Sequence, residues 1–203
     1  MKSLKVTILT LLVLMQLSAP TLSFAETDYE KGLGWVFFGG VLTITANGGM
    51  EDFFNNDRDQ NGKRRYQHRG YEVKSFVIGK NVTQFHMFAF GEDFYPTTMS
   101  VESGNSIFSV VDGWLLNTKT KTLICATDLD RFTWMPVARK IPDSVEIIGV
   151  DAFYPYNHII QIHLPDSVTE IAEDAFDMCS DLESIQLPPK LKIISRATFG
   201  GCT

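Results

Sequence analysis

The sequence has few residues suited to metal or redox chemistry, with only three cysteines and four histidines among 203 residues. A disulfide-stapled domain normally needs an even and denser set of cysteines. No histidine forms a compact ligand spacing with another histidine or with a cysteine. G-x-S-x-G, H-E-x-x-H and phosphate-loop motifs are also absent. These absences argue against an enzyme, and we expect no cofactor.

Basic residues are scarce as well. The chain has 18 basic and 24 acidic residues, a formal net charge of −6. Such a balance disfavours a nucleic-acid partner, because the phosphate backbone is bound mainly by clustered lysine and arginine.

Long apolar runs are missing after the N-terminus. Lys2 and Lys5 precede an apolar run at Val6–Leu17, and Ser23-Phe24-Ala25 follows it. This pattern predicts a secretory signal peptide over residues 1–25, cleaved after Ala25. The run is shorter than the roughly 20 residues that cross a bilayer. We therefore expect no transmembrane segment after cleavage, a net charge of −8, and a secreted or cell-surface location.

The remaining chain repeats one sequence motif at a fixed interval. "IPDSVEIIGVDAF" ends at Phe153, and "LPDSVTEIAEDAF" ends at Phe176, 23 residues later. Related phrases end at Phe90 and Phe199. Apolar residues recur at matching offsets: Ile78, Val82 and Phe85; Ile141, Val145 and Ile148; Leu164, Val168 and Ile171; Leu187, Leu191 and Ile194. A motif that recurs this often at matching offsets indicates a repeat fold rather than a catalytic site.

Each unit must change direction several times within 23 residues. Strand-like stretches at 159–164 and 182–187 run into Pro165 and Pro188, which lack the amide donor needed to continue a ladder. The following Asp-Ala-Phe segment indicates one tight or helical turn. The pattern predicts a β-rich solenoid of short strands and short helical turns, whose coils are stabilised by stacking on one another.

These units resemble BspA-type leucine-rich repeats of bacterial secreted and surface proteins. Residues 164–185 match that pattern nearly throughout, including Cys179 and Leu182, whereas the preceding repeat has Tyr156 in place of the cysteine. "GGVLTITANGGMEDF" at 39–53 is similar to the strand pair that often opens such arrays. The resemblance implies a leucine-rich-repeat, horseshoe-like fold.

The domain organisation follows from this alignment. Residues 26–72 are expected to form an N-terminal β segment with a variable polar loop, and residues 73–203 the repeat array. We place the repeats near 73–90, 141–162, 164–185 and, incomplete, 187–203. The interval between Phe90 and Phe153 is 63 residues, so we assign 91–139 to an insert. Its segment 108–126 predicts a hairpin with strands 114–117 and 122–126.

A weak metal candidate lies in "NNDRDQNG" at 55–62. Asp57, Asp59 and Asn61 reproduce the start of a calcium loop. His68 stands where the bidentate glutamate is required, and residues 63–65 add three cations. A solvated loop is the favoured interpretation.

Cys179 and Cys202 occupy equivalent repeat positions, so stacking brings their backbones to about 5 Å, within reach of a disulfide. Equivalent side chains point in parallel, which favours a ladder of buried thiols. A disulfide and a reactive thiol are the alternatives. Cys125 is expected in the core or on the surface of the hairpin.

The array should present polar strand positions on its inner curve. We expect the side chains of Ile162 and Leu164 to point into the core. The side chains at the alternate strand positions, such as Gln161 and His163, are then expected to point outward. The resulting binding-face candidates are Val77, Lys140, Gln161, His163, Ser184 and Gln186. The alternative is that each is an ordinary solvent-facing strand residue.

The resemblance implies a non-catalytic protein that binds an extracellular protein or glycan, since the family includes adhesins for host or neighbouring cells. The alternative is a targeting fragment of a larger exported enzyme. The sequence stops at "FGGCT" without a polar terminal unit. We expect a fragment of a longer array, a short degenerate copy, or self-association through the uncapped C-terminal end.

Overall fold

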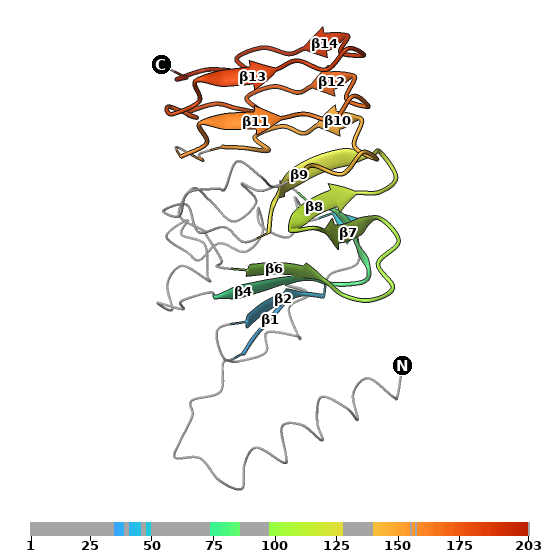
Figure 1. Cartoon of the computed structure of the whole chain (residues 1–203). Coiled ribbons are helices and arrows are strands. Elements are labelled where there is room, and N and C mark those ends of the chain that lie inside the picture. Colours follow the sequence, from blue (N-terminus) through green and yellow to red (C-terminus); the bar gives the residue numbers. More distant parts are fainter. Residues whose placement is uncertain are drawn as a thin grey trace, which may run out of the picture.

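The computed structural model describes residues 35–38, 41–45, 48–49, 74–85, 98–127, 140–154, 156 and 158–202. They form a β-solenoid of about 4 turns (Figure 1), which confirms the predicted fold class. The strands are, in chain order, β1 (Trp35–Phe38), β2 (Val41–Ile44), β3 (Gly48–Gly49), β4 (Ser75–Ile78), β5 (Val82–Gln84), β6 (Thr98–Val101), β7 (Phe108–Val111), β8 (Trp114–Asn117), β9 (Thr122–Ala126), β10 (Ile147–Ile148), β11 (Gln161–His163), β12 (Glu170–Ile171), β13 (Ser184–Gln186) and β14 (Ile193–Ile194).

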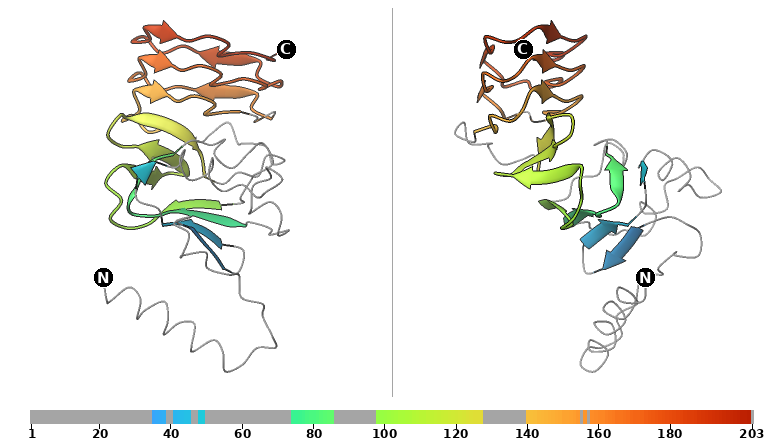
Figure 2. Two further views of the ribbon diagram at one scale, coloured as in Figure 1. Left: turned by 180° about the vertical axis from the view of Figure 1, so that it is seen from behind. Right: turned by 90° about the vertical axis from the view of Figure 1, so that its right-hand side faces the viewer.

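A regular coil contributes one strand to each of two columns. The first column contains β2, β4 and β6 near the N-terminus and β11 and β13 near the C-terminus, and neighbours within each group are parallel. The second column contains β3 and β5, and then β9, β10, β12 and β14, again parallel. In the C-terminal coils the two columns lie on different sides of the stack (Figures 1 and 2).

The N-terminal strands open the array as an antiparallel pair. β1 pairs with β2, and β2 then pairs in parallel with β4 of the following coil. The burial of β4 alternates, with Phe76 and Ile78 fully buried and Ser75 and Val77 partly exposed. This alternation is what a strand with one face on the core requires.

Residues 98–101 correct the predicted extent of the insert. They form β6, which pairs with β4 in a register that joins Phe76 to Met99 and Ile78 to Val101. A further coil of the solenoid therefore begins inside the segment 91–139, which the sequence alignment assigns to an insert.

The predicted hairpin is present with the expected strands, β8 and β9. β7 adds a third antiparallel strand. Asp112 and Gly113 connect β7 to β8 with φ values of 50° and 79°, as tight hairpin turns require. β9 then pairs in parallel with β10, so the hairpin joins the second column of the solenoid.

The Asp-Ala-Phe segments take the tight-turn alternative rather than the helical one, since they are hydrogen-bonded turns and no helix occurs among the described residues. Asp151, Asp174 and Ala197 adopt φ of 55°, 56° and 53° at equivalent places. A left-handed residue cannot continue a right-handed helix, so each segment ends after a single turn.

The core is a stack of equivalent side chains, with an aromatic ladder at its centre. Trp114 meets Phe153 edge-to-face at 5.8 Å between ring centroids, and Phe153 stacks on Phe176 at 4.6 Å. Backbone hydrogen bonds join the same turns, since the Phe153 amide donates to the Ala175 carbonyl at 2.9 Å. Each coil is thus held by its neighbours.

Two predictions lie outside the described residues: the signal peptide at 1–25, and the calcium-loop candidates Asp57, Asp59 and Asn61. Among the residues that are described, no helix has the length and apolar character needed to span a bilayer.

Candidate functional site

The strands β11 and β13 place four of the predicted binding-face residues side by side. Their parallel register pairs Gln161 with Ser184 and His163 with Gln186, and all four side chains are exposed. Between these rows, Ile162 is buried and Ile185 partly buried against the core. We call Gln161, His163, Ser184 and Gln186 the polar column; it is fixed by backbone pairing rather than by loops.

The other two candidates lie elsewhere. Val77 is in β4, half-buried and paired with Thr43 and Ser100 in the four-stranded sheet. Lys140 is exposed but belongs to no strand, and its ammonium forms an ion pair with Asp143 at 2.6 Å. The carbonyl of Lys140 accepts a hydrogen bond from Trp114 Nε1 at 3.1 Å. The structure therefore does not bring Val77 and Lys140 into the polar column.

The sequence interpretation also missed outward polar positions on β6. Thr98 and Ser100 are exposed, and Thr98 Oγ1 lies 2.8 Å from Ser75 Oγ on β4. The signal was present, because Ile78 and Val101 are 23 residues apart, as are Phe85 and Phe108.

The thiols of Cys179 and Cys202 hold equivalent positions in neighbouring coils, with Cys179 buried and Cys202 partly buried. Cys179 Sγ donates to the Phe153 carbonyl and Cys202 Sγ to the Phe176 carbonyl, each at 3.3 Å, and both thiols are free. Burial raises the pKa of Cys179 to about 12 and also raises the pKa of Cys202. Cys125 is buried beside Met99, and its pKa is likewise raised by burial. Thiolates are the reactive form, so the raised pKa values disfavour reactivity of these thiols.

The acidic side chains of the described part form no cluster of three or more groups suited to a metal. They gather instead at the turns. Burial, together with the nearby charges of Asp174, Asp177 and Glu173, raises the pKa of Asp151 to about 6. Arg196 forms an ion pair with Glu173 in this region.

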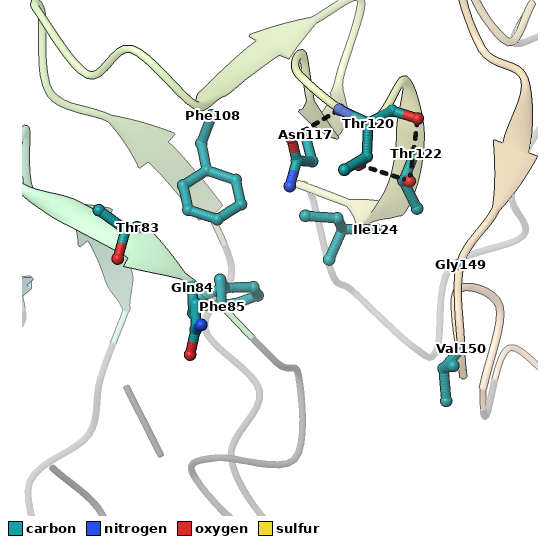
Figure 3. A pocket seen from close by; sticks show the side chains of 10 residues that line it. All are labelled: Thr83, Gln84, Phe85, Phe108, Asn117, Thr120, Thr122, Ile124, Gly149 and Val150. Carbon is teal, nitrogen blue, oxygen red and sulfur yellow. Dashed lines mark hydrogen bonds between the residues drawn. The ribbon is translucent and has the colours of Figure 1, made fainter. Parts of the chain in front are cut away.

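A second surface feature lies between β5 and the hairpin. It is a cavity of about 310 Å³ lined by Thr83, Gln84, Phe85, Phe108, Asn117, Thr120, Thr122, Ile124, Gly149 and Val150 (Figure 3). The sequence analysis nominated none of these residues for binding, because they come from separate parts of the chain.

A comparison with known families accounts for the C-terminal coils. The family described as "BspA type Leucine rich repeat region (6 copies)" matches residues 138–203. Residues 138–203 thus match the pattern of BspA-type leucine-rich repeats. The match begins just before Lys140, so this BspA-type region contains the whole polar column.

Solved structures extend the likeness to the fold of more of the chain. The pneumococcal vaccine antigen PcpA superimposes with a TM-score of 0.50 at 23% identity, over 64% of this chain and 31% of that one. A leucine-rich repeat protein from Eubacterium ventriosum gives a TM-score of 0.48 at 22% identity, over 66% and 35%. The chain thus spans about a third of each of these proteins. Among curated proteins, none matches it.

Proposed function

We propose that this chain is a secreted or cell-surface protein that binds an extracellular protein or glycan without catalysis. The observation that carries the proposal is the polar column, in which two rows of exposed side chains are held in register by the β11–β13 pairing. A rigid sheet that presents hydrogen-bonding groups at fixed spacing binds with little loss of conformational entropy.

The chemistry of the column suits hydrogen bonding. Gln161 and Gln186 each offer an amide donor and acceptor, Ser184 offers a hydroxyl, and His163 offers one donor and one acceptor when neutral. Repeat arrays use such extended surfaces for recognition.

Three further observations support an extracellular location. Residues 1–25 have the composition of a signal peptide. The fold resembles that of a protein described as a pneumococcal vaccine antigen, and the BspA-type repeats over 138–203 are typical of bacterial surface proteins.

The test is binding of the labelled chain, residues 26–203, to arrays of purified extracellular-matrix proteins and of glycans. For any spot that binds, we expect the His163→Ala/Gln186→Ala variant to bind about thirtyfold more weakly, since two lost hydrogen bonds of about 1 kcal/mol each amount to about 2 kcal/mol. A Lys190→Ala/Lys192→Ala variant truncates two exposed side chains next to β14 and should bind like the unaltered chain. Equal loss in both variants, or no bound spot at all, would contradict the proposal.

A further inference from the structure

The second strand column is interrupted in the coil that begins with β6. Among the described residues, β5 pairs only with β3, and the column resumes with β9. The register of β4 with β6 identifies the residues that occupy the position of the missing strand in the second column. Because Ile78 pairs with Val101, the residues Asn105–Phe108 take the place that Val145–Ile148 take after Ile141.

Asn105 replaces the missing backbone ladder with its side chain. Its Nδ2 donates to the carbonyls of Gly79 and Val82 at 2.9 and 3.1 Å. Its Oδ1 accepts from the amides of Ile107 and Phe108, both at 2.8 Å. In this place the described residues form no strand ladder between the two coils. The chain then continues into the antiparallel β7–β8–β9 unit instead of covering β5.

The cavity of Figure 3 lies at this interruption. Thr83, Gln84 and Phe85 form one wall, and the opposite wall comes from the hairpin and from Gly149 and Val150 of the next coil. A volume of about 310 Å³ is at the small end of the range found for ligand sites. None of the described residues that line it carries a charge.

One wall presents an oriented hydrogen-bond donor. Asn117 Oδ1 accepts from the amides of Lys119 and Thr120 at 3.0 and 3.1 Å, and this fixes the side-chain amide. Its nitrogen therefore faces the cavity (Figure 3). Close by, the hydroxyls of Thr120 and Thr122 are 2.8 Å apart and add acceptor capacity.

The other parts of the wall are apolar. Phe85 and Phe108 meet edge-to-face with ring centroids 6.4 Å apart, and Ile124 and Val150 add aliphatic surface. A charged ligand would lose its hydration without an ionic partner among the described lining residues. A wholly apolar ligand would instead leave the Asn117 donor unsatisfied.

We propose that this cavity binds a neutral saccharide unit, such as one ring at the end of a glycan. A sugar ring carries hydroxyls for Asn117 and the threonines and a C–H face for the apolar wall, and it needs no charged partner. The cavity shares no residue with the polar column, so saccharide binding here is tested independently of the proposed function. An extended peptide added to β5 fits less well, because β5 has only three residues to pair.

The test is an NMR titration of the ¹⁵N-labelled chain, residues 26–203, with glucose, galactose, mannose and N-acetylglucosamine. At least one of these should shift the amide signals of Thr83 and Thr120 saturably, with a dissociation constant of about 1 mM for so small a ligand. N-acetylneuraminic acid, which is charged, should leave these signals unchanged. The peptide VEIIGV, copied from residues 145–150, tests strand addition to β5.

Two variants test whether the NMR shifts come from a saccharide bound in the cavity. Asn117→Asp keeps the acceptor that caps the turn but removes the donor, and Val150→Trp fills the cavity from a position that is 46% exposed. Each should weaken saccharide binding at least about tenfold. The matched variants Asn81→Asp and Val111→Trp alter exposed residues outside the lining and should bind like the unaltered chain.

Several results would overturn the proposal. These are an absence of saturable shifts with all four neutral sugars, shifts that map away from the cavity, or shifts that survive both Asn117→Asp and Val150→Trp. A response to VEIIGV alone would also overturn it and would assign the cavity to strand addition.

Discussion

The coil of residues 164–186 and the last coil, residues 187–202, have the same apolar pattern but very different burial. Ile171 is fully buried, whereas its equivalent Ile194 is 48% exposed. Leu164 is buried, whereas Leu187 is exposed. A coil's own sequence therefore does not determine its burial, which depends on the coil that follows. This is the nearest-neighbour behaviour expected of a solenoid.

The aromatic ladder shows the same difference. Phe176 lies between Phe153 at 4.6 Å and Phe199 at 5.5 Å, and it is fully buried. Phe199 has an aromatic neighbour in the coil before it and is only partly buried. Equivalent substitutions at Phe176 and Phe199 should therefore have unequal costs.

The largest predicted effect is that of Phe176→Ala. Removing a buried phenylalanine costs about 3–5 kcal/mol, and here it also separates two coils. Phe199→Ala should cost only about 1–2 kcal/mol, because part of its ring is already in water. Urea unfolding followed by circular dichroism measures both values. Equal costs would show that the last coil is as tightly held as the one before it.

A second prediction concerns association through the exposed face of the last coil. Ile193 and Ile194 are 50% and 48% exposed on β14, which pairs on one side with β12. Unpaired strand edges with apolar side chains promote pairing between chains. We therefore expect a protein of residues 26–203 to self-associate, and Ile193→Lys/Ile194→Lys to shift it toward monomer.

Sedimentation velocity over a range of concentrations measures this shift. The double variant should change the free energy of unfolding by no more than about 0.5 kcal/mol, as is usual for exposed positions. Ile171→Lys is the contrasting variant and should unfold the neighbouring coils, because it buries an unpaired charge. A chain that stays monomeric at every concentration would contradict the prediction.

The C-terminal coils could be predicted from the sequence because each local signal agreed with the 23-residue period. Pro165 and Pro188 follow the ends of β11 and β13, and in the coils before the last one the apolar offsets match the buried positions. The alternation of side chains then located the polar column on β11 and β13. The equivalent places of Cys179 and Cys202 in neighbouring coils followed from the same period.

The coil of β6 was missed because the alignment relied on the Ala-Phe phrase, which this coil lacks. The 23-residue interval persists from Ile78 to Val101 and from Phe85 to Phe108. Trp114 of the hairpin then packs on Phe153 and extends the aromatic ladder. The cavity could not be predicted either, since it depends on a side chain, Asn105, that takes the place of backbone pairing.

The smallest predicted effect is on stability and concerns a residue in the turns of the coils. Asp151, Asp174 and Ala197 hold equivalent left-handed positions, so a carboxylate is not needed for the turn. Asp151 is partly buried and faces Asp174, Asp177 and Glu173, and its pKa is raised to about 6. An unfolded aspartate has a pKa of about 3.9. Between these values the folded chain holds a proton that the unfolded chain has released, so this group's contribution to stability improves as the pH falls from 7 to 4.

Asp151→Asn should therefore stabilise the protein at pH 8, by about 1 kcal/mol after allowing for solvent screening of this partly exposed group. Asparagine tolerates the left-handed conformation, so the turn itself should persist. The gain should shrink as the pH falls through 6 and disappear below about pH 3, where the carboxyl is protonated in both the folded and the unfolded state. Thermal unfolding at several pH values measures it, with Asp166→Asn at an exposed turn position as the control for loss of one negative charge. A gain that is independent of pH would mean that the carboxylate at 151 is well solvated and that its coil is no more crowded than the last one.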